Sequence, residues 1–493
     1  MTTSKLDYAT PEAQRAPVVK LYLGIGLLVF AGMMLVGVLM RAAQGAAIIS
    51  IGPDLFYQLL TLHGAGMVGT AGLAGLAVNW YFLSKYVRLN QKIFLGALVL
   101  SLVAVAMIVG SILIGKFAAG WTFLYPLPAM SLGLWSTGAA LTFVGGLLLL
   151  GVAFLLVYLD MGIAIVRRYG SIARALGLPM LFGREPIDPT HPPTVVASAM
   201  VIIVNVAGIA VGAIVLIMTI LHLVHPPLAP DALLMKNLIY FFGHVFINAT
   251  IYSAVTAVYE ILPVYARRPW TISRPFLASW LAVTLMVMAV YPHHLLMDFA
   301  MPPWMAIMGQ IVSYTSGIPV LVVTAYGGLM LVYRSGIRWD AASSLLVLSL
   351  FGWAAGIIPA VIDGMISVNL VMHNTLWVPG HFHFYLLLGV LPMVLGFASY
   401  LCANGQQGRT GLLWVAVYAT GGTLLCLSLL VSGALSVPRR FAVHEESWQW
   451  LGNVGALSGG LVLIGTLMIA VPILLKLPRA RLDSTGVGVG AGA

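Results

Sequence analysis

Two histidines stand close together in one apolar stretch, residues 372–385, which read MHNTLWVPGHFHFY. Neutral imidazole is the commonest protein ligand for metals, so His381 and His383 point to metal or cofactor binding. Because an α-helix turns about 100° per residue, the two rings would leave a common helix about 200° apart. One helix could therefore ligate two different cofactors, and Gly380 would leave room for a bulky partner beside it.

Four more histidines lie in other apolar runs, namely His63, His244 and the adjacent pair His293–His294. With the spans given below, all six fall in the outer third of the membrane on four helices. A histidine in lipid is costly and usually faces the interior of a helix bundle, so we interpret six at one depth as ligands. The alternative is a set of unrelated residues that hydrogen-bond to neighbouring helices. The adjacent pair cannot share one helical face, so binding a single metal requires a local distortion, which Pro292 can supply.

The composition indicates which elements position these histidines. The 493 residues are 61% hydrophobic and 8% charged, whereas a soluble domain carries about 25% charged residues. We predict an all-α polytopic membrane protein, a single domain over residues 1–493 with a tail at 1–17 and a disordered tail at 482–493. Apolar windows of about 20 residues predict about twelve spans. In chain order they are roughly 18–42, 56–84, 93–115, 130–158, 194–223, 235–262, 276–299, 303–333, 342–371, 374–402, 411–436 and 449–475.

The basic residues predict how these spans are oriented. With the amino terminus inside, 19 of the 24 Lys and Arg residues lie on the inner side. The other five are Arg41, Lys116, Lys236, Arg439 and Arg440. Cytoplasmic loops are enriched in Lys and Arg, so we expect a multi-pass protein of the bacterial inner (cytoplasmic) membrane with both termini cytoplasmic. The net charge of +10 then reflects topology and contact with the lipid bilayer, and we expect no nucleic-acid partner.

Polar side chains continue down the predicted helix that carries His244. They recur three or four residues apart, as residues on one face of a helix do, and are Asn248, Tyr252, Thr256 and Tyr259. Glu260 adjoins the inner end of this stripe. A polar stripe in lipid faces a bundle interior or a file of water, so we predict a proton route to the metal-binding histidines. Hydrogen bonding between helices is the alternative for the Tyr and Thr residues, and a place at the membrane boundary is the alternative for Glu260.

Six stretches together resemble the catalytic subunit I of the haem-copper oxidase superfamily, to which the cytochrome c oxidases belong. They occur in the order expected of that family and extend over the twelve spans. They are LLTLHGAGM around His63, GWTFLYP (120–126), YFFGHVFINATIY around His244, YPHHLLMDF around the histidine pair, HNTLWVPGHFHFYLLLG, and PRR (438–440).

The resemblance implies two haems. His63 and His383 would be the axial ligands of a low-spin haem, and His381 would be the proximal ligand of a high-spin haem. His373 would lie near the haem propionates or be an ordinary boundary histidine. The sequence contains no CxxCH motif, so the haems would be held without covalent bonds.

The resemblance also implies one copper ion and a pair of propionate-binding cations. His244, His293 and His294 would bind the copper opposite the high-spin haem. Arg439 and Arg440 would pair with the haem propionates, and a charged partner for these anions is what the outer side next to the histidine layer requires.

The sequence departs from the oxidases at the position that would decide the substrate. Those enzymes carry a tyrosine four residues after the first copper-binding histidine or, in a second branch, six residues before the histidine pair. Here those positions are Asn248 and Val287. The family's nitric oxide reductases also lack this tyrosine, and they carry carboxylates where this chain has Asn248 and Tyr252. Asn makes no carboxylate contact that would favour iron, so three histidines and copper are expected.

We therefore predict an oxidoreductase that reduces two NO with two electrons and two protons to N2O and water, a reaction of denitrification. Its catalytic residues would be Asn248, Tyr252, His244, His293 and His294. The alternative enzyme is a terminal O2 reductase of the respiratory electron-transport chain, either a cytochrome c or a quinol oxidase, which uses Tyr252 or no tyrosine. A non-catalytic haem electron carrier or a transporter is the alternative from another class.

The electron donor is expected to be a separate molecule. The sequence has no cupredoxin-like domain, and its two cysteines, Cys402 and Cys426, form neither a disulfide framework nor a metal-binding cluster. We expect a second subunit with an electron-accepting centre, and cytochrome c, a cupredoxin or quinol as the donor.

Overall fold

The computed structural model describes residues 12–45, 49–403 and 409–477, and the regular elements within them are helices. Twelve of these helical segments are long and apolar enough to cross a membrane, which confirms the predicted all-α, twelve-span fold. Most of the predicted amino-terminal tail and all of the predicted carboxy-terminal tail lie outside the described residues, while helix α1 already begins at Glu12.

The spans run in chain order from α1 to α18, and several consist of more than one helical element. They are α1 (Glu12–Gly45), α2 (Pro53–Leu83), α3 (Gln91–Leu113), α4 (Thr137–Tyr169), α7 (Pro193–Val224), α8 (Ala232–Ala254) with α9 (Thr256–Ala266), α10 (Arg274–Ala289) with the 3-10 helix η2 (Tyr291–Leu295), α11 (Pro303–Val320) with the π-helix η3 (Leu321–Tyr326) and α12 (Gly327–Val332), α13 (Ala341–Asp363), α15 (Trp377–Tyr385) with the π-helix η4 (Leu386–Val390) and α16 (Leu391–Ala403), α17 (Arg409–Ala434), and α18 (Glu446–Lys476). Three short helices lie between spans: α5 (Ile172–Ala175), α6 (Leu178–Leu181) and α14 (Ile366–Met372).

Two predicted spans have different ends in the structure. The fourth begins at Thr137 rather than near residue 130, because the apolar run before it contains Gly133 at φ 82° and ends at Ser136, whose side chain caps the helix. The ninth ends at Asp363, and the apolar residues that follow form the separate helix α14. Hydrophobicity alone does not distinguish an apolar loop from a span.

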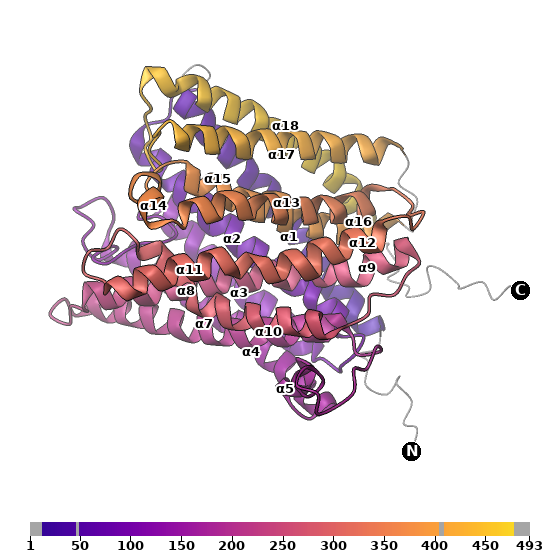
Figure 1. Cartoon of the computed structure of the whole chain (residues 1–493). Coiled ribbons are helices and arrows are strands. Elements are labelled where there is room, and N and C mark those ends of the chain that lie inside the picture. Colours follow the sequence, from indigo (N-terminus) through magenta and orange to yellow (C-terminus); the bar gives the residue numbers. More distant parts are fainter. Residues whose placement is uncertain (1–11, 46–48, 404–408, 478–493) are drawn as a thin grey trace, which may run out of the picture.

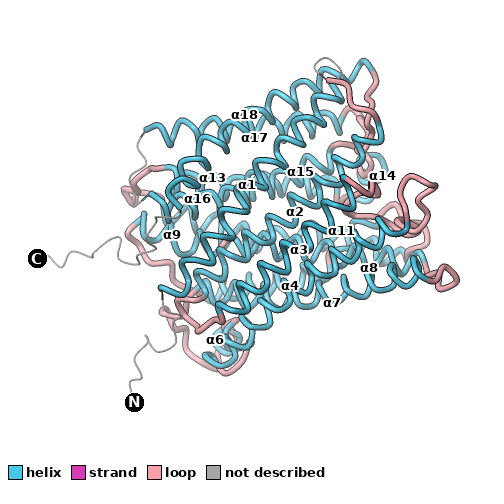
Figure 2. The backbone as a smooth tube through the Cα atoms, turned by 180° about the vertical axis from the view of Figure 1, so that it is seen from behind, coloured by secondary structure: helices cyan, strands magenta, loops and turns pink. Residues whose placement is uncertain are grey.

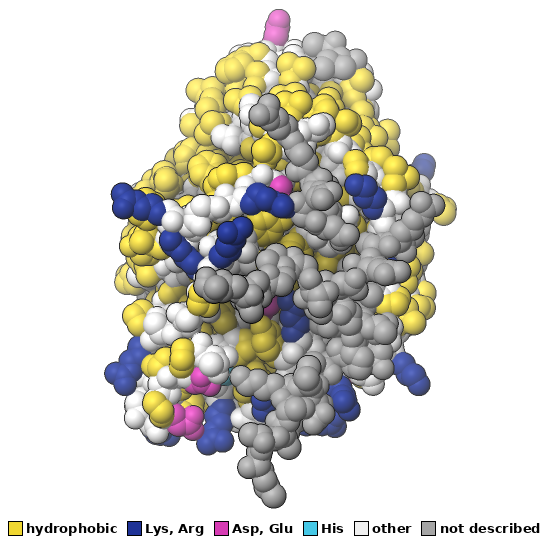
Figure 3. All heavy atoms as spheres, turned by 90° about the vertical axis from the view of Figure 1, so that its right-hand side faces the viewer, with side chains coloured by type: hydrophobic (Ala, Val, Ile, Leu, Met, Phe, Trp, Pro, Cys, Tyr) yellow, Lys and Arg dark blue, Asp and Glu magenta, His cyan; other side chains and the backbone are white. Residues whose placement is uncertain are grey.

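The helices lie roughly side by side, and the loops gather at the two ends of the bundle (Figures 1 and 2). Helix α14 lies at one end, and α5 and α6 lie at the other. The end that carries α5 and α6 displays many Lys and Arg side chains (Figure 3). This clustering agrees with the charge asymmetry in the sequence, from which this end was predicted to be the cytoplasmic one.

The span formed by α15, η4 and α16 is the most central one. In its most apolar window 89% of the residues are buried, against 18–56% in the other spans of the described chain. Gly380 lies against α17: a Cβ at this position would meet the backbone nitrogen of Leu430 at 3.0 Å. Gly380 does leave room for the close approach of a bulky partner, and that partner is the neighbouring helix α17.

The adjacent histidines lie on distorted backbone, as expected. Helix α10 ends at Ala289, and His293 and His294 belong to the 3-10 helix η2, in which Pro292 occupies the first turn. A 3-10 helix has three residues per turn, so it changes the relative direction of neighbouring side chains. Both rings can then reach the same place.

Candidate functional site

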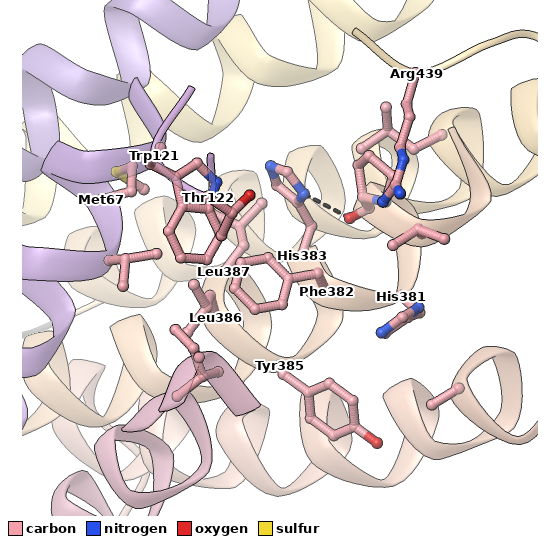
Figure 4. A pocket seen from close by; sticks show the side chains of 18 of the residues that line it. Met67, Trp121, Thr122, His381, Phe382, His383, Tyr385, Leu386, Leu387 and Arg439 are labelled. Carbon is pink, nitrogen blue, oxygen red and sulfur yellow. Dashed lines mark hydrogen bonds between the residues drawn. The ribbon is translucent and has the colours of Figure 1, made fainter. Parts of the chain in front are cut away.

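The six predicted ligand histidines line one internal cavity of about 480 Å³. A cavity of this size lies within the range of cofactor sites and far exceeds a packing defect. Its walls are otherwise mostly aliphatic and aromatic, as Figure 4 shows around the α15 segment. The structure thus gathers side chains from α2, α8, η2 and α15, which lie far apart in the sequence.

Two of these histidines have backbone carbonyls as partners. The Nδ1–H of His63 donates to the carbonyl of Met33 at 2.7 Å. The Nδ1–H of His383 donates to the carbonyl of Pro379, also at 2.7 Å, and this bond is the dashed line at His383 in Figure 4. A carbonyl can only accept, so the proton lies on Nδ1 and Nε2 is free in both rings. The two free nitrogens come from different walls of the cavity, which is the arrangement that a bis-histidine haem requires.

A second group of histidines forms a compact cluster. One ligand atom each of His244, His293 and His294 lies within 4.8 Å of the others, and the two Nε2 atoms of the adjacent pair are 3.0 Å apart. Nδ1 of His293 contacts the hydroxyl of Ser313 on α11. Three neutral imidazoles without a carboxylate suit copper or zinc better than a hard cation.

His381 differs from the other haem-ligand candidates in its partner. Its Nδ1 lies 2.6 Å from the Oδ2 atom of Asp363, the last residue of α13. Figure 4 shows His381 and His383 directed to different parts of the cavity, as their spacing on a helix predicts. Tyr385, one turn after His381, also lines the cavity. Asp363 and Tyr385 were not among the predicted site residues, although a lone carboxylate in an apolar span was a signal for the first.

The outer rim of the cavity is cationic. Arg439 and Arg440 both line it, and Arg440 Nη2 donates to Thr122 Oγ1 at 3.2 Å. Burial lowers the pKa of Arg439 to about 10, so this side chain stays charged at neutral pH. Burial, with Arg439 nearby, lowers the pKa of His373 to about 4. Two arginines beside a neutral histidine leave a net positive rim that suits an anion.

Arg41 is a third cation in the cavity wall. The sequence predicted only that Arg41 lies on the outer side of the membrane. In the structure Arg41 is 9% exposed and lines the cavity. Its guanidinium donates to Gln44 Oε1 at 2.6 Å and to the carbonyl of Leu451 at 2.9 Å. Its position inside a predicted membrane span was the signal that it faces the bundle interior.

Asn248 contacts the histidine cluster directly. Its amide nitrogen lies 2.9 Å from the carbonyl of His244 and 3.1 Å from Nδ1 of the same residue. Tyr252, one turn further, lines the cavity between the rings of Trp280 and Trp353, with centroids 5.6 and 5.7 Å away.

The rest of the polar stripe divides between two environments. Thr256 Oγ1 donates to the carbonyl of Ser253 at 3.0 Å, and the hydroxyls of Tyr259 and Thr324 are 2.7 Å apart. Glu260 instead faces the α2–α3 loop and α7. Its carboxylate accepts from Lys85 at 3.2 Å, Tyr86 at 2.8 Å and Thr194 at 2.5 Å.

These residues fit the implied cofactors. Two imidazoles with free Nε2 atoms can hold a low-spin haem across an apolar cavity, and His381 can ligate a second haem. The cationic rim can take the propionates, and His244, His293 and His294 can hold copper.

Comparisons with known proteins identify the family of this chain. Residues 17–476 match the family described as Cytochrome C and Quinol oxidase polypeptide I. Cytochrome c oxidase subunit 1 of Thermostichus vulcanus is 23% identical over 420 residues, 80% of this chain and 71% of that protein. Cytochrome c oxidase subunit 1 of Corynebacterium diphtheriae is 27% identical over 436 residues, 80% of this chain and 69% of that protein.

The fold is shared with a solved structure described as a heme-copper terminal oxidase dimer. The TM-score is 0.78 at 18% identity, and the alignment covers 96% of this chain and 86% of the other. The family match covers nearly the whole sequence, and its members are oxidoreductases that bind haems and copper. The chain therefore belongs to the Cytochrome C and Quinol oxidase polypeptide I family, that is, to the catalytic subunits of the haem-copper oxidases.

Proposed function

We propose that this chain reduces O2 to water as the catalytic subunit of a respiratory terminal oxidase. The observation that carries the proposal is the shared cavity, in which a three-histidine cluster lies with His381 and with the His63–His383 pair. The relatives named above are cytochrome c oxidase subunits. Their names favour O2 over NO as the substrate. The terminal O2 reductase, given above as the alternative, is therefore the leading proposal.

In this proposal each histidine group has one task. His63 and His383 hold the low-spin haem that receives electrons, and His381 holds the high-spin haem. The three-histidine cluster holds copper. When bound, the haem iron and the copper would supply the redox chemistry for reducing a small gas molecule.

A tyrosine in the cavity supports O2 as the substrate. The oxidases that this chain resembles draw an electron and a proton from a tyrosine beside the copper. Neither of the two expected positions holds one, but Tyr252 and Tyr385 line the same cavity. We propose Tyr252 as the donor, since it lies one helical turn beyond Asn248 on the helix that carries His244.

Protons would reach Tyr252 along the polar stripe. Thr256, Tyr259 and Thr324 provide hydroxyls below it. Glu260 would serve as the inner entrance, although its bonds to Lys85, Tyr86 and Thr194 are also those of a structural tie. The proposed proton route would therefore pass from the hydroxyls of Tyr259 and Thr324 to a carboxylate, Glu260, that contacts a different set of residues.

NO is the second candidate substrate, and one observation favours it. Asn248 stands where the oxidases carry the crosslinked tyrosine, and its amide contacts His244. An amide N–H could donate to a bound N–O species, whereas it cannot supply the electron that O2 cleavage needs. This observation keeps the reduction of NO to N2O as the alternative.

The proposed enzyme works in the bacterial cytoplasmic membrane as one membrane domain over residues 1–493 with both termini cytoplasmic. The histidines then lie nearer the outer face, where a second subunit would deliver electrons from cytochrome c, a cupredoxin or quinol. The twelve spans and the Lys and Arg side chains at one end of the bundle support this orientation.

The two substrates are separated by turnover of the purified enzyme. It would be given excess reductant and either O2 or anaerobic NO, with an O2 electrode and N2O quantification as readouts. The proposal expects four electrons consumed per O2 and little N2O from NO. Rapid N2O formation together with slow O2 consumption would overturn it in favour of the second candidate.

A further inference from the structure

The ligand candidates differ in what their second ring nitrogen contacts. Nδ1 of His63 and Nδ1 of His383 each donate to a backbone carbonyl, and Nδ1 of His293 contacts a serine hydroxyl. Only His381, among the histidines of the described chain, has a carboxylate at this nitrogen, with Asp363 Oδ2 at 2.6 Å. A carboxylate is a stronger acceptor than a carbonyl or a hydroxyl because it is charged.

Within the part of the chain that the structure describes, no side chain other than His381 lies at ion-pair distance from Asp363, although Arg439 interacts with its charge from further away. The Oδ2 atom of Asp363 and Nδ1 of His381 are both buried and have no other hydrogen-bond partner among the described residues; they lie 2.6 Å apart, at ion-pair distance but without the alignment of a hydrogen bond. The two side chains are 11% and 16% exposed. A buried carboxylate is costly unless it has a partner, so the pair is mutually dependent.

The backbone around Asp363 fixes this contact. The carbonyl of Asp363 accepts from Asn369 Nδ2 at 2.6 Å, and Trp377 Nε1 donates to the carbonyl of Pro359 at 3.0 Å. The second bond ties the last turn of α13 to the first turn of α15. The two helices are therefore held at the height where Asp363 meets His381.

Helix stability does not explain the carboxylate. Asp363 is the last residue of α13, and the negative end of the helix dipole disfavours an anion there. Its cost requires a compensating partner, and the nearest one is the His381 ring. A metal-ligating imidazole is such a group, since the acceptor at its second nitrogen orients the ring and raises its basicity.

We propose that Asp363 is a positioning residue that accepts the Nδ1 proton of His381 and makes this imidazole a stronger donor to the high-spin haem iron than a carbonyl-bonded histidine would be. This inference rests on the proposed haem at His381. A more basic axial ligand stabilises the oxidised iron, which lowers the reduction potential of that haem and strengthens the iron–nitrogen bond. The low-spin haem, held by His63 and His383, lacks this influence.

The test compares Asp363→Asn with the intact enzyme. The first readout is the iron–histidine stretching frequency of the reduced high-spin haem by resonance Raman, and the second is the midpoint potential of each haem. In Asp363→Asn the frequency is expected to fall and the potential of the CO-binding haem to rise, while the low-spin haem keeps its potential. Asp363→Glu is expected to restore part of both shifts. Asp54→Asn, at an exposed residue at the start of α2, serves as the matched loss of one carboxylate.

Unchanged frequency and potential in Asp363→Asn, with the CO-binding haem still present, would overturn the inference and leave the proposed function standing. If Asp363→Asn loses the haem, retention by Asp363→Glu supports a need for the carboxylate. Loss in both variants would overturn the tuning role in favour of a structural one. An intact enzyme that binds no CO would instead refute the haem at His381 and with it the proposed function.

Discussion

Two histidines of one short helix, His383 and His381, show how a single element can serve two sites with different demands. His383 donates to the carbonyl of Pro379, four residues earlier in the same helix, so its ring is fixed by local backbone. His381 relies on Asp363, a side chain from another helix. Hydrogen bonding to an axial ligand is one of the ways in which a protein adjusts a haem, so the two proposed haems would be adjusted differently.

The histidines proposed to bind copper also have side-chain rather than backbone partners. His293 contacts the hydroxyl of Ser313, and His244 contacts the amide of Asn248. The proposed reactive side of the cavity is therefore tuned by side chains, and the proposed electron-transfer side is held by backbone carbonyls. Substitution can change the first set of partners but not the second.

The largest effects should come from removing the two histidines separately. His383→Ala is expected to lose the low-spin haem spectrum and to keep CO binding, whereas His381→Ala is expected to do the reverse. Each variant should fall from two haems per chain to one in a haem assay. Loss of the same spectral species in both variants would break the comparison between the two sites.

Ser313→Ala should weaken copper binding without altering the haems. The hydroxyl orients His293, and loss of such a partner typically costs 10–100-fold in metal affinity. The copper-to-haem ratio after dialysis against a chelator measures the change. Ser316→Ala is the matched control, because Ser316 lines the same cavity and bonds to the carbonyl of Ser313 rather than to a ring. An equal loss of copper in both variants would argue against an orienting role.

Asn248→Leu should have a smaller effect on O2 turnover. One hydrogen bond to the His244 ring is worth about 1 kcal/mol, so a fall in rate of up to about tenfold is expected. Turnover with O2 and NO measured in parallel makes this variant informative. A selective collapse of N2O formation would identify Asn248 as a substrate-binding group and would favour NO as the substrate.

The smallest effect is expected from the ion pair between Lys236 and Asp298, near the three histidines proposed to bind copper. Lys236 of α8 pairs with Asp298, which follows η2, at 2.7 Å, so this pair links the two elements that carry the cluster. Lys236 lowers the pKa of Asp298 below the usual 3.8. The pair therefore stabilises the fold above pH 3.8, and this contribution is lost as the pH falls through the lowered pKa.

Removing the pair should cost at most about 1 kcal/mol, as for other partly exposed ion pairs. Thermal unfolding of Asp298→Asn and of the unaltered protein at a series of pH values measures it. The difference between their melting temperatures should shrink below pH 3.8. A difference that is independent of pH would show that Asp298 acts through packing rather than charge.

The sequence predicted the fold well because lipid makes hydrophobicity a strong signal. Twelve spans, the distortion at Pro292 and the gathering of six histidines followed from apolar runs and from the cost of imidazole in lipid. The end of α13 at Asp363 and the loop before Thr137 did not follow, because they depend on capping and on turns within apolar sequence.

Partners of the ligands were harder to predict than the ligands. Asp363 lies 18 residues before His381 in the sequence, and the contact arises only where α13 packs against α15. Arg41 joins the cavity from the first span, and Gly380 faces Leu430 rather than a cofactor. Such contacts depend on how helices pack, which the spacing of residues within one helix does not determine.

The central claim is that one cavity holds two haems with different ligation and that only one of them binds gas. Optical spectra of the reduced enzyme before and after CO addition, combined with a haem count, test it most directly. The account predicts two haems per chain, of which one binds CO and the other retains its bis-histidine spectrum unchanged. A single haem per chain, or CO binding to neither or both haems, would contradict it.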